Sequence, residues 1–174
     1  MPDDTHSLEI LKEITRIATS TPDLENILGK IIAVIKDKMR IDACGIYLID
    51  DADGRLHLKA SSGLPLEKLS NISLEMGKGV TGWVAMNKAT LALTEALHDP
   101  RFVYFPEIGE EKYQSMISSP ILADNRSIGV INVQTLDQRT FTETEVSLLE
   151  TIANQLSGCI LNAIHYTNMQ MHLK

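Results

Sequence analysis

Cysteine, aromatic residues, positive charge and long apolar runs are all scarce in this chain of 174 residues. Its two cysteines, Cys44 and Cys159, are too few for a disulfide framework, and we expect both to be small buried residues in a reducing compartment. Lysine and arginine number 16 against 23 acidic residues, which leaves a net charge of -7. Nucleic-acid and anionic-membrane contacts depend on clustered lysine and arginine, so we expect neither partner.

Membrane spans and secretory signals are also missing from the sequence. Charges interrupt each apolar run after a few residues, far short of the roughly 20 that cross a bilayer. The first residues, Met1-Pro2-Asp3-Asp4, lack the basic and apolar regions of a signal peptide. We therefore expect a cytoplasmic protein, and its 44% apolar residues are enough for the core of one domain.

Helical periodicity marks both ends of the chain. Apolar residues recur at helical spacing over 8–18 and again over 24–39, after the break at Pro22. Thr142 and Glu145 have the spacing of a capping box, and the helix that they begin can run to Leu173. Because this helix of about 30 residues is longer than usual, we expect its distal end to pack on a partner or to continue into another domain.

Between the helices the apolar period changes to that of strands. Two runs over 43–49 and 55–60, joined by an Asp/Gly turn, predict an antiparallel hairpin, and 116–122 with 128–134 predict a second. Short strands are expected at 72–76 and 90–94, with a short helix near 80–87 between them. A long aromatic loop over 95–114 completes the chain, and such loops often bind ligands.

A glycine motif precedes the short helix. Gly77-Lys78-Gly79-Val80-Thr81-Gly82 matches G-x-G-x-x-G, and Glu95 follows at a strand end, where a dinucleotide site would place an acid. That motif belongs to a parallel strand–helix–strand unit, whereas this chain is built from antiparallel hairpins. We therefore assign the glycines to a turn and to close packing, with contact between the backbone N–H groups and an anionic ligand as the alternative.

No catalytic or metal-binding constellation stands out. The five histidines are scattered without the spacing of paired ligands, so we expect no metal and no cofactor. Ser118-Ser119 lies in a strand-like run and is assigned to small residues that face a pocket or a neighbouring layer, not to a nucleophile, because no supporting histidine and acid can be singled out. The acid pairs Glu110-Glu111 and Asp50-Asp51 are assigned to solvated turns or a surface helix. We expect this domain to have no catalytic residues and not to be an enzyme.

The order of the elements and motifs resembles the GAF domain family. The resemblance is carried by Gly77-Lys78-Gly79-Val80-Thr81-Gly82-Trp83-Val84-Ala85, Asp99-Pro100-Arg101-Phe102, Ser118-Ser119-Pro120-Ile121, Ile128-Gly129-Val130-Ile131-Asn132-Val133 and Phe141-Thr142-x-x-Glu145. It covers 8–165, leaving 1–7 as a disordered N-terminus and 166–174 as a continuation of the last helix toward a downstream domain. It implies an α+β fold, a GAF/PAS-like antiparallel sheet of about six strands with the N- and C-terminal helices packed on one face.

Within the family, the stretch from Asp99 to Ile121 is most similar to the N-terminal GAF domain of nitrogen-branch phosphoenolpyruvate-protein phosphotransferases. Histidine kinases, diguanylate cyclases and enhancer-binding activators carry similar modules. Cyclic-nucleotide GAF domains have Asn-Lys where this chain has Gln134-Thr135, and bilin-binding ones use a cysteine that the 95–114 loop lacks. The resemblance therefore implies a sensor role without either of those ligands.

The function predicted from this resemblance is a regulatory module that senses an unknown small-molecule effector within a larger bacterial signalling protein. Apolar walls and polar anchors of the pocket are expected from Trp83, Glu95, Phe102, Tyr113, Ser118, Asn132 and Gln134. Asn132 and Gln134 share one face of their strand because side chains alternate, although the sequence does not say which face. The alternative for the three aromatic residues is that they only fill the core.

A compatible hypothesis is dimerisation and signal relay through the terminal helices, with or without a ligand. The expected homodimer interface consists of Ile10, Ile14, Ile17, Leu149, Ile152, Leu156, Cys159 and Ala163, which have the three- and four-residue steps of a coiled-coil seam. A Leu156→Glu change is then expected to give monomers. A third hypothesis is an enzyme like free methionine sulfoxide reductase, which uses more cysteines than this chain has.

Overall fold

The computed structural model describes residues 4–63, 71, 73–106 and 108–172 of the chain. Its helices are α1 (Asp4–Ala18), α2 (Leu24–Met39), α4 (Gly79–Asn87) and α5 (Glu143–His172), with short 3-10 turns η1 (Ala96–His98) and η2 (Glu110–Lys112). Its strands are β1 (Ala43–Ile49), β2 (Leu56–Ser62), β3 (Ser73–Leu74), β4 (Leu91–Leu93), β5 (Ser115–Ala123) and β6 (Arg126–Thr135). Each helix and strand predicted from the sequence has a counterpart, with boundaries shifted by a few residues.

The six strands form one antiparallel sheet in the order β3-β2-β1-β6-β5-β4, which confirms the predicted α+β class. The two predicted hairpins are β1–β2 and β5–β6. They are joined by pairing between β1 and β6, where Ile46 lies opposite Ile131. The longest strands therefore lie in the middle of the sheet, and the two short ones, β3 and β4, form its edges.

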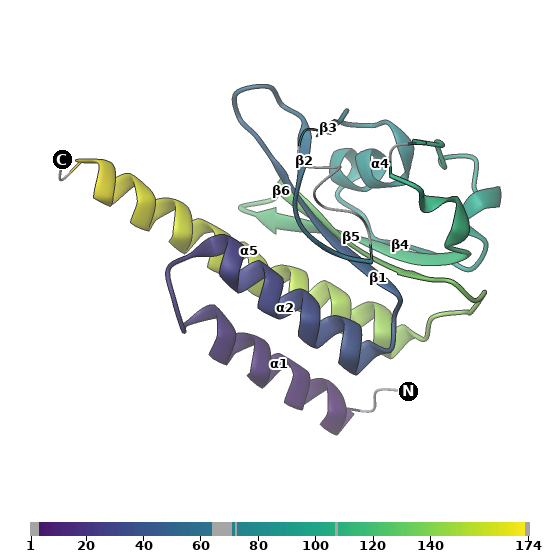
Figure 1. The fold of residues 1–174 in the computed structure, drawn as a ribbon, viewed down its shortest axis with the longest axis horizontal. Coiled ribbons are helices and arrows are strands. Elements are labelled where there is room, and N and C mark those ends of the chain that lie inside the picture. The colour runs from purple at the N-terminus through teal and green to yellow at the C-terminus, as the bar shows by residue number, and fades with distance from the viewer. Residues whose placement is uncertain (1–3, 64–70, 72, 107, 173–174) are drawn as a thin grey trace.

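Both faces of the sheet are covered (Figure 1). Helices α1, α2 and α5 lie on one side, and α4 with the 95–114 segment lies on the other. Side chains alternate between the two cores along each strand: Cys44 and Ile46 of β1 pack toward α2 and α5, while Ala43 and Tyr47 pack toward α4. This second core holds the candidate site described below.

The predicted capping box at the start of α5 is confirmed. The Glu145 backbone N–H donates to Thr142 Oγ1 at 3.1 Å, and Glu145 Oε1 accepts from the Thr142 backbone N–H at 3.0 Å. Arg139 forms an ion pair with the same Glu145 carboxylate, which is almost fully buried. Because the Arg139 backbone N–H also donates to Ser115 Oγ of β5 at 2.9 Å, these contacts connect the start of α5 to the sheet.

Helix α1 begins earlier than the sequence indicated. It starts at Asp4, so residues 4–7 of the predicted disordered segment 1–7 are helical, and residues 1–3 lie outside the described part. At the other end, α5 continues as a helix through 166–172 and projects beyond the sheet (Figure 1). Within the described residues, no helix combines the length and the apolar content needed to cross a membrane.

The side chains predicted to form the dimer interface are buried inside a single chain. Each is at most 7% exposed, and seven of the eight belong to the same core cluster: Ile10, Ile14, Ile17, Leu149, Ile152, Leu156, Cys159 and, outside that cluster, Ala163. The physical reason is that α1 packs against both α2 and α5, so the apolar seam of α5 faces its own chain. The predicted interface is therefore corrected, and contact with a second copy has to use other residues.

Candidate ligand site

Three polar side chains lie side by side on the sheet face that α4 covers. Ser118 and Asn132 are paired directly across β5 and β6, and Gln134 lies two residues further along β6. The Asn132 side-chain amide donates a 2.8 Å hydrogen bond to Thr81 Oγ1 of α4, which identifies the face. The sequence predicts these three residues as polar anchors, and the structure brings them together, each at most 2% exposed.

Several polar atoms of this group lack hydrogen-bond partners among the described residues. They are Ser118 Oγ, Asn132 Oδ1, Gln134 Oε1 and the hydroxyl oxygen of Tyr47, whose side chain packs into the same core. An unsatisfied buried polar group costs about 1–3 kcal/mol, and native proteins keep few of them. Such a group on one sheet face is typical of a site that a ligand or bound water completes.

The glycine segment before α4 brings this helix close to the sheet. Gly77 and Gly79 have φ of +82° and +73°, a backbone conformation that residues other than glycine rarely adopt. At Gly82 a Cβ atom would lie 2.4 Å from the Glu75 carbonyl oxygen. The predicted turn and close packing are confirmed, and they place Thr81 over Asn132.

Glu110 is a site residue that the sequence interpretation missed. It is the first residue of η2, and its side chain lines the small cavity between α4, β5 and the loop. Burial raises the pKa of this carboxyl group to about 7; a hydrogen bond from Gln134 acts to lower it and the nearby charge of Glu111 to raise it. The interpretation of Glu110-Glu111 as a solvated pair is therefore wrong for Glu110, while Glu111 is exposed.

The predicted aromatic wall residues lie at different depths. Tyr113 is buried, and its hydroxyl donates a 2.9 Å hydrogen bond to the Gly63 carbonyl just after β2. Phe102 is half-buried and lines the small cavity. Trp83 is half-buried further out, with the Arg101 guanidinium carbon 4.8 Å from its ring centroid. Of the three, Phe102 lines the small cavity, and Trp83 and Tyr113 do not.

Glu95 does not belong to the site. Its side chain is 57% exposed, and the carboxylate lies 3.8 Å from Nδ1 of His98 in the adjacent η1 turn. The prediction placed it at a strand end, but β4 is an edge strand that ends at Leu93, so Glu95 already lies in the loop. This residue is corrected from a ligand contact to a surface acid.

A very small cavity lies beside the polar cluster, and Thr81 and Glu110 line it, whereas Ser118, Asn132 and Gln134 do not. Its volume is about 10 Å³, and it is lined by Leu74, Lys78, Gly79, Val80, Thr81, Phe102, Val103, Phe105, Glu110 and Met116. A single water needs roughly 10–15 Å³, whereas small-molecule pockets usually measure about 300–1,000 Å³. The cavity that these described residues enclose is therefore too small for a metabolite.

Wider hollows lie on the helical side of the sheet. One of about 340 Å³ runs between the tips of both hairpins and α5, past Leu48, Ile128 and Ile164. Another, of about 640 Å³, lies between the start of α2 and the projecting part of α5. Both have mostly apolar walls without a cluster of buried polar groups, and the larger one is open to solvent, so they resemble surface grooves more than a metabolite site.

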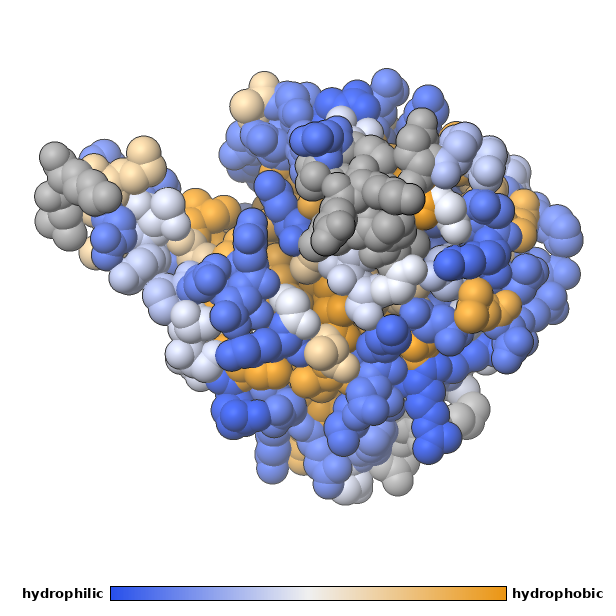
Figure 2. Space-filling view, in the orientation of Figure 1, coloured by the Kyte–Doolittle hydropathy of each residue, from blue (hydrophilic) through white to orange (hydrophobic). Residues whose placement is uncertain are grey.

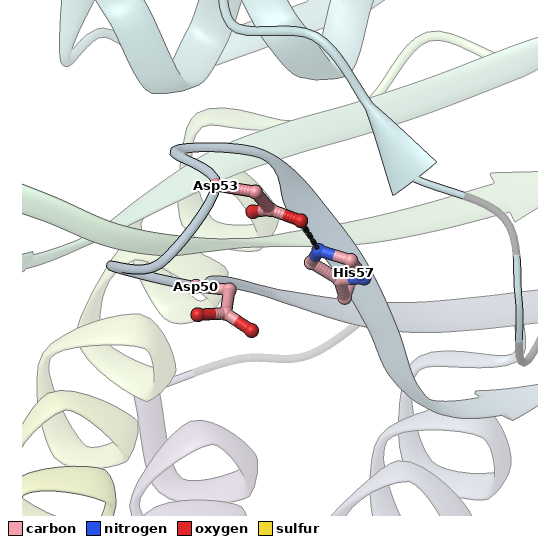
Figure 3. A group of neighbouring side chains, drawn as sticks. All are labelled: Asp50, Asp53 and His57. Atoms are coloured by element: carbon pink, nitrogen blue, oxygen red, sulfur yellow. Dashed lines mark hydrogen bonds and ion pairs between the residues drawn. The ribbon is translucent and has the colours of Figure 1, made fainter.

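A group of three ionisable residues occupies the β1–β2 turn (Figure 3). Asp53 Oδ2 lies 2.7 Å from His57 Nε2, and one oxygen each from Asp50 and Asp53 and one ring nitrogen of His57 all lie within 4.8 Å of one another. Asp50 accepts a hydrogen bond from the Ala52 backbone N–H, and Asp53 accepts one from Arg55. The Arg55 bond is the largest cause of a lowered Asp53 pKa. These contacts explain the group as a stabilised turn.

Residues 23–160 match the GAF domain family, and the chain belongs to that family. This assignment confirms the resemblance carried by the glycine segment, the 99–121 stretch and the last helix. The fold, with terminal helices on one face and the polar cluster on the other, agrees with it.

Several relatives of this chain are GAF-containing regulatory proteins or solved GAF domains. The chain is 29% identical over 150 residues to "Phosphoenolpyruvate-dependent phosphotransferase system" of Escherichia coli K12, covering 86% of this chain and 20% of that protein. It is 24% identical over 168 residues to the formate hydrogenlyase transcriptional activator of Salmonella typhimurium, covering 92% and 24%. The solved GAF domain of a Coxiella burnetii phosphoenolpyruvate-protein phosphotransferase superposes with a TM-score of 0.89 at 28% identity, covering 96% and 99%. The chain thus corresponds to a regulatory GAF module and spans a fifth to a quarter of the two curated relatives.

The same fold occurs in an enzyme. The free methionine-R-sulfoxide reductase of Neisseria meningitidis has a TM-score of 0.81 at 23% identity, covering 95% of this chain and 96% of that one, which is a likeness of fold alone. Here Cys44 and Cys159 both lie in the core on the helical side, away from the polar cluster. Burial raises the pKa of both thiols, the opposite of what a nucleophilic cysteine needs.

Proposed function

We propose that the chain is a regulatory module that senses a small molecule within a larger signalling protein. The observation that carries this proposal is the set of buried polar atoms without partners on the α4 face, from Tyr47, Ser118, Asn132 and Gln134. A few placed polar groups within apolar walls are usual for small-molecule sites. Because the amide oxygens of Asn132 and Gln134 accept hydrogen bonds, we expect a ligand that carries N–H or O–H groups.

The parent protein is part of the same proposal. The curated relatives are several times longer than this chain, which supports a downstream output domain that the module regulates. Their names suggest a phosphotransferase or a transcriptional activator as that output. We keep the cytoplasmic location and the absence of catalysis in this module as parts of the proposal.

A thermal-shift screen of a metabolite library, run on the wild type and on Asn132→Leu, tests the sensing role. A ligand at about 100 times its Kd adds roughly 2.7 kcal/mol to the unfolding free energy, which raises the melting temperature by about 5–10 °C. We expect this shift to disappear in Asn132→Leu, since the change removes a polar contact at the site. Asn154→Leu, on the exposed surface of α5, is the matched control and should keep the shift.

Two outcomes of the screen contradict the proposal. A wild type that no metabolite stabilises speaks against sensing. A ligand that stabilises the wild type and Asn132→Leu equally places the binding site elsewhere.

The second candidate function is dimerisation with signal relay through α5. Figure 2 shows apolar side chains where the projecting end of this helix leaves the body of the domain. Large apolar residues are exposed along that end, namely Leu161, Ile164, Tyr166, Met169 and Met171. These side chains have little of their own domain to pack against, so a second copy would cover surface that is costly to leave in water.

Sedimentation of an Ile164→Glu variant tests this second candidate. Ile164 is 48% exposed, so the charge is tolerated in the monomer but not in an apolar interface. We expect a dimeric wild type at high micromolar concentration and a monomeric Ile164→Glu protein. Asn162→Glu, also exposed and two residues away on α5, should remain dimeric. A monomeric wild type would remove the dimer from the proposal.

A further inference from the structure

A side chain of η2 lines the small cavity beside the polar cluster. Gly109, with φ of +69°, allows the sharp turn into η2, and this turn directs the Glu110 side chain to the cavity. The Glu110 carboxyl group hydrogen-bonds to Gln134, one of the predicted polar anchors. By contrast, its neighbours Glu111 and Lys112 are exposed. Glu110 is therefore the one residue of η2 that reaches into the site.

We propose that Glu110 is a built-in stopper of the ligand site, and that η2 has to move outward before a ligand can reach Gln134 and Asn132. This inference rests on the proposed sensing function and adds its regulation. The cavity of about 10 Å³ that Glu110 and Thr81 line holds no metabolite, so some element has to move before a ligand can pass from it to Gln134 and Asn132. The sheet and α4 are held by long strand ladders and by the close approach at Gly82, whereas η2 is a single turn.

Few hydrogen bonds hold η2 itself, while the buried side chains of Ile108 and Tyr113 hold the chain on either side of it. The Tyr113 backbone N–H donates to the Glu110 carbonyl at 3.0 Å, the Ile108 N–H to Phe105 at 2.9 Å, and the Gln114 N–H to Thr135 at 2.9 Å. The Tyr113 hydroxyl adds its bond to Gly63. Glu111 and Lys112 are exposed, and a short exposed turn of this kind can open locally while its buried flanks stay in place.

The stopper is coupled to pH through the charges around it. Glu111 on the same turn and the hydroxyls of Tyr47 and Tyr113 face Glu110, and Lys78 at the start of α4 lines the same cavity. Inside the site the pKa of Glu110 is about 7, whereas a carboxyl group in water has a pKa of about 4.3. The closed form therefore holds a proton that the open form releases. Protonation of Glu110 therefore stabilises the closed form relative to the open form. This contribution is complete below about pH 4.3 and is lost as the pH rises through 7.

Hydrogen–deuterium exchange on the whole chain at pH 6 and pH 8 tests this proposal without any ligand. After correction for intrinsic exchange rates, protection of the amides in 108–114 should fall roughly tenfold between these pH values. Amides of the β5–β6 ladder serve as the internal reference and should keep their protection. In Glu110→Gln, which keeps the size of the side chain and cannot ionise, the pH dependence should vanish, while the matched Glu111→Gln variant should retain it.

The outcomes separate the stopper from the sensing function. Protection of 108–114 that does not change with pH in the wild type overturns the proposal, even if Glu110→Gln fails to fold. Equal loss of the pH dependence in Glu110→Gln and Glu111→Gln overturns it as well. The exchange experiment uses no ligand, so its result does not depend on whether the metabolite screen finds one.

Discussion

A Leu156→Glu variant is expected to be unfolded or to lose most of its unfolding free energy. Leu156 is 0% exposed and packs where α5 meets the other terminal helices and the sheet. The change removes a buried leucine and places a carboxylate among apolar side chains, a combination that costs more than about 4–5 kcal/mol. Since domains of this size are stable by about 5–15 kcal/mol, most of the stability is lost. Urea denaturation followed by circular dichroism measures this loss.

Leu8→Glu is the control for that experiment. It makes the same chemical change at a side chain of α1 that is 52% exposed and lies outside the proposed dimer surface, so it should fold with a near-normal unfolding midpoint. A well-folded, monomeric Leu156→Glu protein would contradict the packing described here. It would restore the sequence-based interpretation of Leu156 as a dimer contact.

Arg139→Met is expected to lower the unfolding free energy by about 3 kcal/mol. Arg139 forms an ion pair with Glu145, which is 2% exposed, and donates a 3.1 Å hydrogen bond to the Arg40 carbonyl. Methionine keeps much of the length of the side chain but leaves the Glu145 carboxylate buried without its cation. Removal of one partner of a buried pair is costly for this reason, although replacement of both can be neutral. Chemical denaturation again provides the measurement.

Arg16→Met gives the matched comparison. It removes the arginine of another Arg–Glu pair, Arg16–Glu13, which lies on the exposed surface of α1. Exposed pairs add little to stability, so the unfolding midpoint should remain unchanged within error. Equal losses in Arg139→Met and Arg16→Met would show that burial of Glu145 is not the cause.

The fold could be predicted well because its signals are local. Hairpin turns, the period of the strands and the Thr142–Glu145 cap each depend on residues close in sequence, and each was found in place. The partner of the α5 seam could not be predicted in the same way. Steps of three and four residues identify an apolar face, but they do not say whether that face meets α1 of the same chain or a second copy.

In the candidate site, too, some residues could be predicted from the sequence and one could not. Ser118, Asn132 and Gln134 could be predicted from strand alternation and from the family resemblance. Glu110 could not, because nothing in the pair Glu110-Glu111 says which acid turns inward. That depends on the left-handed turn at Gly109 and on the space beneath α4, both properties of the folded chain. The glycine before the pair was the available signal, and it indicates a turn without its direction.

The most direct test of the ligand site compares the unfolding free energies of Ser118→Ala and Ser119→Ala. These serines are neighbours on β5 and nearly fully buried, but Ser119 Oγ bonds Thr90 Oγ1 at 2.9 Å, whereas Ser118 Oγ has no partner among the described residues. Ser119→Ala should lose about 1 kcal/mol. If the Ser118 hydroxyl is kept for a ligand, Ser118→Ala should lose nothing or become more stable. A loss at Ser118 as large as that at Ser119 would contradict this account.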